Sequence, residues 1–176
     1  MANEILDIIT SRCSVRKYLS DEIPEEDIIR IIESGIRAPS AGNRQPWRVV
    51  VTKEAALKEK LKDGALGQSF IAQAPVVLTI CMVPEESAER YGERGRRLYA
   101  FQDTAAMTQN ILLAAHAMGY GACWVGAFDD NAVSDVLNVP HGVRPVSMVP
   151  IGKVAGPYPE KRKRRTLADV VIREKF

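Results

Sequence analysis

The sequence predicts an α+β fold in which helices cover a central mixed β-sheet. Segments of helical and of strand character follow one another irregularly along the 176 residues. Residues 75–83 are apolar on both faces of a strand, as in the centre of a sheet covered on both sides. Residues 97–118 form the longest helical pattern, which Gly119 ends. We expect residues 1–176 to form a single domain, since this length is ordinary for one.

Two helices are expected before the first strand. The first begins at Asn3, whose side chain can cap the backbone N–H groups of the first turn. Its apolar residues recur at helical spacing and are expected on its buried side: Ile5, Leu6, Ile8 and Ile9. The second helix begins near Pro24, because proline suits the first helical position, and it runs to about Arg37.

The remaining elements follow from β-branched runs and from helical periodicity. Further strands are expected at 47–52, 122–127 and 146–154. Shorter helices are expected at 53–61 and 130–137. No repeat, linker or low-complexity tract indicates an internal domain boundary.

The long helix also predicts an oligomer. Nearly all of residues 105–117 are apolar or small, and the exceptions are Thr108, Gln109, Asn110 and His116. Such a helix must be covered on most sides, and a short chain has little core of its own for this purpose. We therefore expect burial against a second copy of the chain, in a homodimer.

The charge distribution argues against a nucleic-acid partner. The chain has 24 Lys and Arg and 22 Asp and Glu, which gives a formal net charge of +2. Five of the basic residues form one run at 161–165, and the 19 others face 22 acids. Such a run can mark nucleic-acid binding. In an otherwise acidic chain, a solvated face with one phosphate-binding residue is the preferred interpretation.

The cysteines, the histidines and the hydropathy of the sequence argue against a disulfide framework, a metal site and a membrane partner. Cys13, Cys81 and Cys123 lie far apart, so we expect reduced thiols in a cytoplasm and no disulfide framework. Neither His116 nor His141 has a companion at ligand spacing, so no metal is expected. The best apolar stretch is about half of the ~20 residues that a membrane helix needs, so no membrane partner is expected.

The first segment with chemical potential surrounds Arg12, Ser14 and Arg16. In an extended conformation these three side chains point to one face, because strand residues alternate. Two guanidinium groups and a hydroxyl at this spacing can hold a phosphate and a second electron-rich oxygen. A solvated basic stretch explains the same residues equally well. Cys13 is expected to face away from the ligand side.

The second such segment is a loop between a helix and a strand. Pro39, Pro46 and a glycine hold it rigid. It carries the hydroxyl of Ser40 and the carboxamides of Asn43 and Gln45, which suit hydrogen bonds to a heterocycle and its polyol tail. A tight connection with a packed tryptophan explains the prolines but not this density of polar groups.

Six segments, taken together, resemble the nitroreductase family, whose members bind FMN at a dimer interface. They are R-x-S-V-R from Arg12, A-P-S-x-x-N-x-Q-P-W from Ala38, A-P-V-V from Ala74, D-T-A-A-M-T-Q-N-I-L-L-A-A from Asp103, G-x-G-A-C-W-V-G from Gly119, and a basic segment before Leu167. They cover essentially the whole chain in order. The resemblance implies a nitroreductase-like fold, an intertwined homodimer and FMN as the cofactor.

The resemblance assigns four basic or hydroxyl positions to the flavin of the same chain. Arg12 and Ser14 match positions that hold the FMN phosphate or ribityl chain, and Arg164 matches a C-terminal phosphate contact. Arg16 matches a basic position near the pyrimidine N1–C2 edge. A guanidinium there stabilises negative charge on the reduced flavin and keeps its own proton at any working pH.

Further positions match a loop of the other subunit and backbone groups that face the flavin ring. Pro39, Ser40 and Asn43 match a loop that reaches the flavin from the opposite subunit. The backbone N–H groups around Gly126 and Ala127 match those that face N5 and O4. No side chain is expected to be catalytic, because flavin N5 carries the hydride chemistry.

These observations predict an FMN-dependent oxidoreductase that moves electrons from NAD(P)H to a small organic acceptor by a ping-pong mechanism. The acceptor classes considered are nitroaromatics, quinones and flavins. Gly-Tyr-Gly at 119–121 lacks the spacing of a dinucleotide fingerprint, so the nicotinamide is expected to bind transiently. Two alternatives stay open: a flavin-binding regulatory protein without turnover, and a flavin-fragmenting or dehalogenating relative. Only the short stretch at 84–96 lies between the central strand and the long helix, so the acceptor pocket is either open or closed by a partner.

Overall fold

A strand with apolar residues on both faces forms the centre of the sheet. In the computed structural model, which describes residues 2–176, β2 (Val76–Met82) is buried at every residue. It pairs antiparallel with β1 (Trp47–Thr52) and with β4 (Arg144–Gly152), and β3 (Gly121–Ala122) pairs with β4. The strand order is β1-β2-β4-β3. The predicted covering of this strand on both sides is confirmed.

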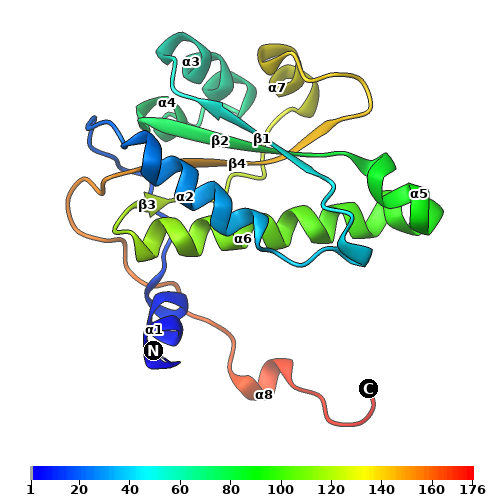
Figure 1. Ribbon diagram of the computed structural model, residues 1–176. Helices are drawn as coiled ribbons and strands as arrows, with labels where there is room; N and C mark the ends of the chain where they lie inside the picture. Colours follow the sequence, from blue (N-terminus) through cyan, green and yellow to red (C-terminus); the bar gives the residue numbers. More distant parts are fainter. Residues whose placement is uncertain (1) are drawn as a thin grey trace.

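Helices cover the sheet in two layers (Figure 1). The first layer holds α2 (Glu25–Ile36) and α6 (Ala100–Ala117), and the second holds α3 (Ala55–Gly64), α4 (Phe70–Gln73) and α7 (Asp130–Leu137). Leu78 of β2 packs into the core below the first layer, and its neighbour Val77 packs into the core below the second. Side chains of a strand alternate between faces, so one apolar strand serves both cores.

The predicted strand at 122–127 is only partly formed. After Ala122 the ladder with β4 stops, because the Cys123 N–H donates to the Pro150 carbonyl at 3.4 Å and proline has no N–H to donate in return. Pairing resumes at Val125, which exchanges two backbone hydrogen bonds with Met148. The expectation of a continuous strand there was wrong.

Parallel pairing enters the sheet through the N-terminal segment. The four strands are antiparallel to their neighbours, but Ser14 forms a parallel bridge with Ala122. The Val15 N–H donates to the Ala122 carbonyl at 3.0 Å, and the Val15 side chain is buried in the second core. The sheet is therefore mixed, as expected, although by a bridge and not by a full strand.

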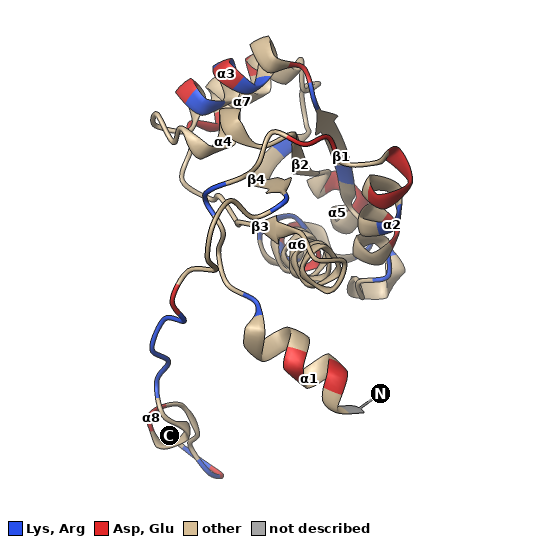
Figure 2. Ribbon diagram, turned by 90° about the vertical axis from the view of Figure 1, so that its left-hand side faces the viewer, with Lys and Arg blue, Asp and Glu red and all other residues tan. Residues whose placement is uncertain are grey.

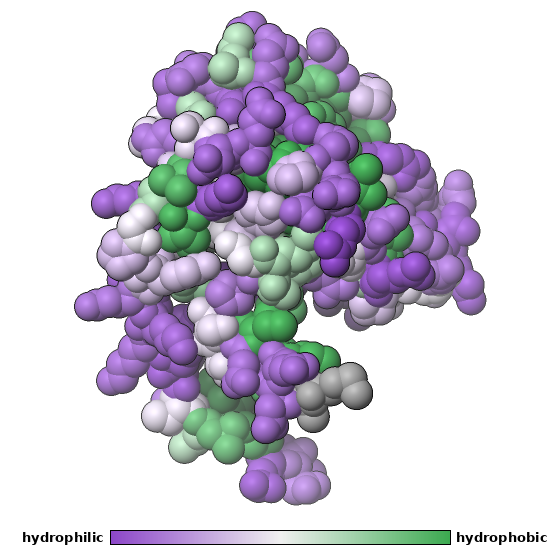
Figure 3. All heavy atoms as spheres, turned by 60° about the vertical axis from the view of Figure 1, so that its left-hand side comes forward, coloured by the Kyte–Doolittle hydropathy of each residue, from purple (hydrophilic) through white to green (hydrophobic). Residues whose placement is uncertain are grey.

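Two arms extend from the body of the molecule (Figures 1 and 2). The N-terminal arm is α1 (Ala2–Ser11), in which Asn3 is an internal residue and not the cap. The C-terminal arm is the tail at 155–176, which contains α8 (Leu167–Val170). Figure 3 shows apolar surface on these projecting parts.

The arms expose apolar side chains. Ile5, Leu6 and Ile9 are 62%, 60% and 49% exposed, so the expectation of a buried side on α1 was wrong within this chain. The cause is that α1 extends away from the sheet, and helical periodicity does not say what covers an apolar face. The C-terminal arm exposes further apolar residues: Leu167, Val170, Val171, Ile172 and Phe176.

One face of α6 is buried by its own chain. Met107, Ile111 and Ala115 pack into the core between α6, α2 and the sheet. The inference that a partner subunit must supply most of the covering was wrong for this face. Gln102 and Gln109 lie exposed on the other side.

The stretch at 84–96 is helical. α5 (Pro84–Arg94) follows β2 and leads through a π-helical turn, η2 (Gly95–Tyr99), into α6. No helix between residues 2 and 176 is long and apolar enough to cross a membrane. Over the same residues, no group of three His, Cys, Asp or Glu side chains is placed to hold a metal ion.

Candidate functional site

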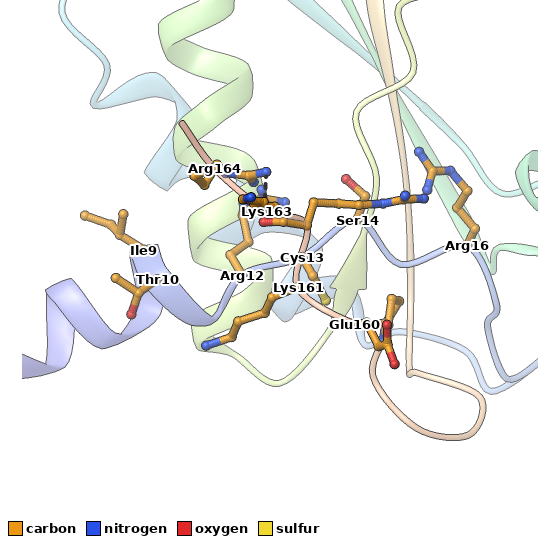
Figure 4. A pocket seen from close by; sticks show the side chains of 12 residues that line it. Ile9, Thr10, Arg12, Cys13, Ser14, Arg16, Glu160, Lys161, Lys163 and Arg164 are labelled. Atoms are coloured by element: carbon orange, nitrogen blue, oxygen red, sulfur yellow. Dashed lines mark hydrogen bonds between the residues drawn. The ribbon is translucent and has the colours of Figure 1, made fainter. Parts of the chain in front are cut away.

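A cavity of about 900 Å³ lies between the roots of the two arms (Figure 4). Its size falls within the range of ~300–1,000 Å³ that is usual for small-molecule and cofactor sites. The N-terminal segment lines it with Ile9, Thr10, Arg12, Cys13, Ser14 and Arg16, and the tail lines it with residues 159–164. Segments separated by about 150 positions in the sequence thus form one site.

The cavity carries an uncompensated positive charge. Its basic residues are Arg12, Arg16, Lys161, Arg162, Lys163 and Arg164, whereas Glu160 is its single acid. None of the six forms a salt bridge with a carboxylate among the residues that the structure describes. Guanidinium groups with free N–H edges and a nearby hydroxyl are suited to a phosphate. The predicted proximity of Arg12, Ser14 and Arg164 is observed.

The extended conformation of the N-terminal segment places its polar residues on the open side. Val15 is buried, while its neighbours Ser14 and Arg16 border the cavity. Cys13 packs against the second core but also borders the cavity, so it does not simply face away as expected. Burial raises the pKa of the nearby Cys123 thiol. Thiolate chemistry at that residue is therefore disfavoured.

The segment at Gly126 and Ala127 lies on the same side of the molecule as Arg16. The Arg16 guanidinium carbon is 5.7 Å from the centre of the Phe70 ring. Gln68, two residues earlier, donates from Nε2 to the Ala127 carbonyl at 3.0 Å. Both predicted flavin-edge groups therefore border the same short segment, 68–70, and sequence reasoning missed that segment because it resembles no motif.

The loop at 39–45 is held in a fixed, unusual conformation. The Ala41 N–H donates to Oδ1 of Asp103 at 3.0 Å, and the Gln45 N–H donates to Oγ of Ser40 at 3.0 Å. Asn43 and Gln45 both have positive φ angles, 55° and 50°, which non-glycine residues adopt rarely. Their side chains are exposed, and Pro39 is exposed as well. Backbone strain of this kind is concentrated at functional sites.

Asp103 is a buried anchor at the start of α6. Its Oδ1 accepts from the loop, while its Oδ2 is buried and has no hydrogen-bond partner among the described residues. Burial raises the pKa of this carboxyl, against the opposing effect of the hydrogen bond from Ala41. No sequence pattern indicates this contact, since 62 positions separate its two partners.

The loop and the cavity lie at opposite ends of α6. The loop is anchored at Asp103, whereas the N-terminal segment is anchored by Ser11, whose Oγ is 2.8 Å from Nε2 of His116. His116 lies thirteen positions after Asp103 in α6, a distance of about 20 Å along the axis. Within one chain, therefore, the loop does not reach the cavity (Figure 1).

The sheet, the cationic cavity and the strained loop define an α+β protein with a candidate site for an anionic ligand. Residues 9–153 match the Nitroreductase family, and the chain belongs to this family. The resemblance noted in the sequence is confirmed, and with it the nitroreductase-like fold.

Known relatives share most of the chain. It is 30% identical over 179 residues to an NADH dehydrogenase of Thermus thermophilus, and the matched region covers 86% of this chain and 87% of the relative. It is 28% identical over 166 residues to the FMN reductase (NAD(P)H) of Bacillus subtilis, with 87% and 67% covered. The solved structure of NfrA2 from B. megaterium matches with a TM-score of 0.91 at 26% identity, over 99% of this chain and 75% of the other.

Proposed function

We propose that this chain is a single-domain, FMN-dependent NAD(P)H oxidoreductase that reduces a small organic acceptor and works as a homodimer. The observation that carries the proposal is the cationic cavity between the arms, with Arg12, Ser14 and Arg164 on its walls. Membership of the Nitroreductase family and similarity to an NAD(P)H-dependent FMN reductase support the choice of cofactor and electron donor.

The residues present fit FMN. The unpaired cations and the hydroxyl of the cavity suit a phosphate, so Arg12, Ser14 and Arg164 would hold that end. Arg16, beside Phe70, would lie near the flavin ring with the backbone of Gly126 and Ala127. The volume of about 900 Å³ leaves room for a ligand of this size.

The loop at 39–45 would complete the site from the partner subunit. Pro39, Ser40, Asn43 and Gln45 belong to the loop that is held at Asp103, whereas the cavity lies toward His116, about 20 Å further along α6. The side chains of Asn43 and Gln45 are exposed in this loop, which Asp103 anchors, and are available to a second copy. The exposed apolar residues of both arms supply surface that a homodimer would bury.

When bound, FMN supplies the hydride chemistry between NAD(P)H and the acceptor, which take turns at one face in a ping-pong sequence. The protein's own groups would bind the flavin and orient it. Arg16 would place a positive charge near the ring, where it would stabilise negative charge on the reduced flavin. The backbone N–H groups of Gly126 and Ala127 would donate hydrogen bonds to the flavin without placing an acidic side chain beside the site of hydride transfer.

The spectrum of the purified protein tests this proposal. We expect a yellow protein that contains FMN, and we expect NADH or NADPH to bleach it under anaerobic conditions. Chromatography of the released flavin identifies the cofactor, and predominant FAD contradicts the phosphate assignment. A yellow protein that neither nucleotide reduces indicates a flavin-binding protein without turnover. Screening nitroaromatic, quinone and flavin acceptors then defines the substrate class.

A further inference from the structure

Helix α5 and the turn after it carry a cluster of two arginines and two tyrosines, here called the α5 cluster: Arg90, Tyr91, Arg94 and Tyr99. The two tyrosine rings meet edge to face, with centroids 5.1 Å apart at 86°. The Arg90 guanidinium carbon lies 5.5 Å from the centre of the Tyr91 ring, and that of Arg94 lies 5.4 Å from the centre of the Tyr99 ring. Arg94 Nε also donates to the Tyr99 hydroxyl at 2.9 Å.

These two arginines differ from every other cation around α5. The neighbouring pairs are Arg44 with Glu89, Arg48 with Glu86, Arg96 with Glu85 and Glu93, and Arg97 with Glu93. The carboxylates of this region are therefore already engaged. Arg90 and Arg94 are exposed and form no salt bridge with any residue that the structure describes.

The α5 cluster is in contact with the loop at 39–45. A Cβ atom placed on Gly42 would lie 2.5 Å from the Tyr91 hydroxyl and 3.2 Å from Nη1 of Arg90. Gly42 has a φ of 55°, so the absence of a side chain serves both its conformation and this close approach. Arg44 Nε donates to the Glu86 carbonyl at 2.6 Å and fixes the loop to α5 a second time. Wherever the loop is placed, the cluster is placed beside it.

We propose that the α5 cluster binds the electron acceptor and selects planar aromatic molecules that carry a carboxylate. The inference rests on the proposed function, in which the loop reaches the flavin of the partner subunit. Arg94 uses its Nε for the Tyr99 hydroxyl, so its two Nη groups and the guanidinium of Arg90 are left for a ligand. Two N–H groups of a guanidinium match a carboxylate in a two-pronged hydrogen bond. Tyr91 and Tyr99, both half-buried beside these arginines, supply aromatic surface of the kind that packs against a planar ring.

A matched pair of acceptors tests the proposal: 4-nitrobenzoate, which is an anion, and 4-nitrobenzamide, which has the same shape without the charge. In each reaction one NAD(P)H and one proton convert the nitro group into a nitroso group, with release of NAD(P)⁺ and water. The ratio of kcat/KM for the acid to that for the amide reports recognition of the carboxylate. It is measured for the wild-type holoenzyme, for Arg90→Gln, for Arg94→Gln and for Arg97→Gln. Arg97 is the control, since it is exposed on the same segment and already paired with Glu93.

We expect the wild-type enzyme to prefer the acid, and Arg90→Gln or Arg94→Gln to lower the ratio about tenfold, the loss expected for one charge-assisted hydrogen bond. Arg97→Gln should leave the ratio unchanged. An unchanged ratio in both test variants overturns the proposal. So does an increase in KM for NADPH with no change in the ratio, because the arginines would then bind the donor's phosphate.

The flavin content and the anaerobic reduction by NAD(P)H are measured on the same samples. They separate failure of this inference from failure of the proposed function. A wild-type protein that holds FMN and is reduced, but shows no preference for the acid, overturns the inference alone. A protein without flavin overturns both.

Discussion

The His116 imidazole lies 2.8 Å, from Nε2 to Oγ, from the Ser11 hydroxyl. This contact joins the end of α1 to the last turn of α6. The ring of Tyr158, at the root of the C-terminal arm, packs edge-on against the same imidazole with centroids 6.1 Å apart. One side chain thus contacts both arms, which carry the candidate phosphate ligands Arg12 and Arg164.

The contact predicts a pH dependence that belongs to His116. Burial, together with the positive charge of Arg12, lowers the pKa of this histidine below its ordinary value. The unfolded chain therefore takes up the proton at a higher pH than the folded chain, and stability falls as the pH drops below about 6.5. His116→Gln should lack this part of the pH dependence. Urea unfolding at pH 7 and pH 5 measures the free energy of unfolding of the wild type and of His116→Gln. An identical pH dependence in these two proteins contradicts the assignment to His116.

Removal of either arginine at the cavity should weaken FMN binding. Charge-assisted hydrogen bonds contribute roughly 1.5–3 kcal/mol, so Arg12→Ala and Arg164→Ala should each lower the affinity by about 10- to 150-fold. Titration of the apoprotein with FMN, followed by flavin fluorescence, gives the constants. Arg30→Ala removes an exposed arginine outside the cavity and serves as the control. Wild-type affinity in both cavity variants would remove the phosphate assignment.

The buried carboxyl of Asp103 should make the protein less stable as the pH rises. Burial raises its folded-state pKa above the ordinary value of 3.8, so the folded chain holds the proton more tightly than the unfolded chain. The free energy of unfolding, relative to Asp103→Asn, should therefore decrease from about pH 4 upwards. Asparagine keeps the acceptor for the Ala41 N–H. Urea unfolding at pH 4 and pH 7 tests this, with Asp21→Asn, at an exposed position, as the control. If the free energy of unfolding of the wild type, relative to that of Asp103→Asn, increases between pH 4 and pH 7, the prediction is wrong.

The apolar face of the N-terminal arm should be needed for dimerisation. Leu6 is 60% exposed in one chain. If a partner buries it, Leu6→Glu should cost roughly 3–5 kcal/mol through an unpaired buried charge. The dimer should then dissociate and lose FMN, while circular dichroism shows a folded chain. Light scattering reports the mass, and Asn3→Glu adds the same charge on the same helix as a control. A variant that remains dimeric excludes this face from the interface.

Local patterns predicted most elements, because their boundaries are set by neighbours in sequence. The strand at Trp47–Thr52 and the helix at Asp130–Leu137 have the expected bounds. The strand after Gly121 did not, since its length depends on Pro150 in a partner strand that is distant in sequence. For the same reason, the apolar pattern of α1 did not reveal that its own chain leaves it uncovered.

The candidate site divides in the same way. Arg12, Ser14 and Arg164 were predicted from residue type and family resemblance, and the structure brings them to one cavity. The contact between Ala41 and Asp103 depends on the packing of α6 and left no sequence pattern. The contribution of the loop at 39–45 to the flavin stays a prediction, because it concerns a second chain.

The most direct test of a site shared between two chains is the activity of a mixture of two inactive variants, Arg12→Ala and Asn43→Ala. After subunit exchange, half of the dimers are heterodimers, and each has one site with both lesions and one site with neither. NAD(P)H-dependent acceptor reduction should return to about a quarter of the wild-type rate. If the cavity and the loop of one chain served the same site, each site of a heterodimer would carry one lesion, no intact site would exist, and the mixture would stay as inactive as its parents. No recovery after verified exchange therefore contradicts the account.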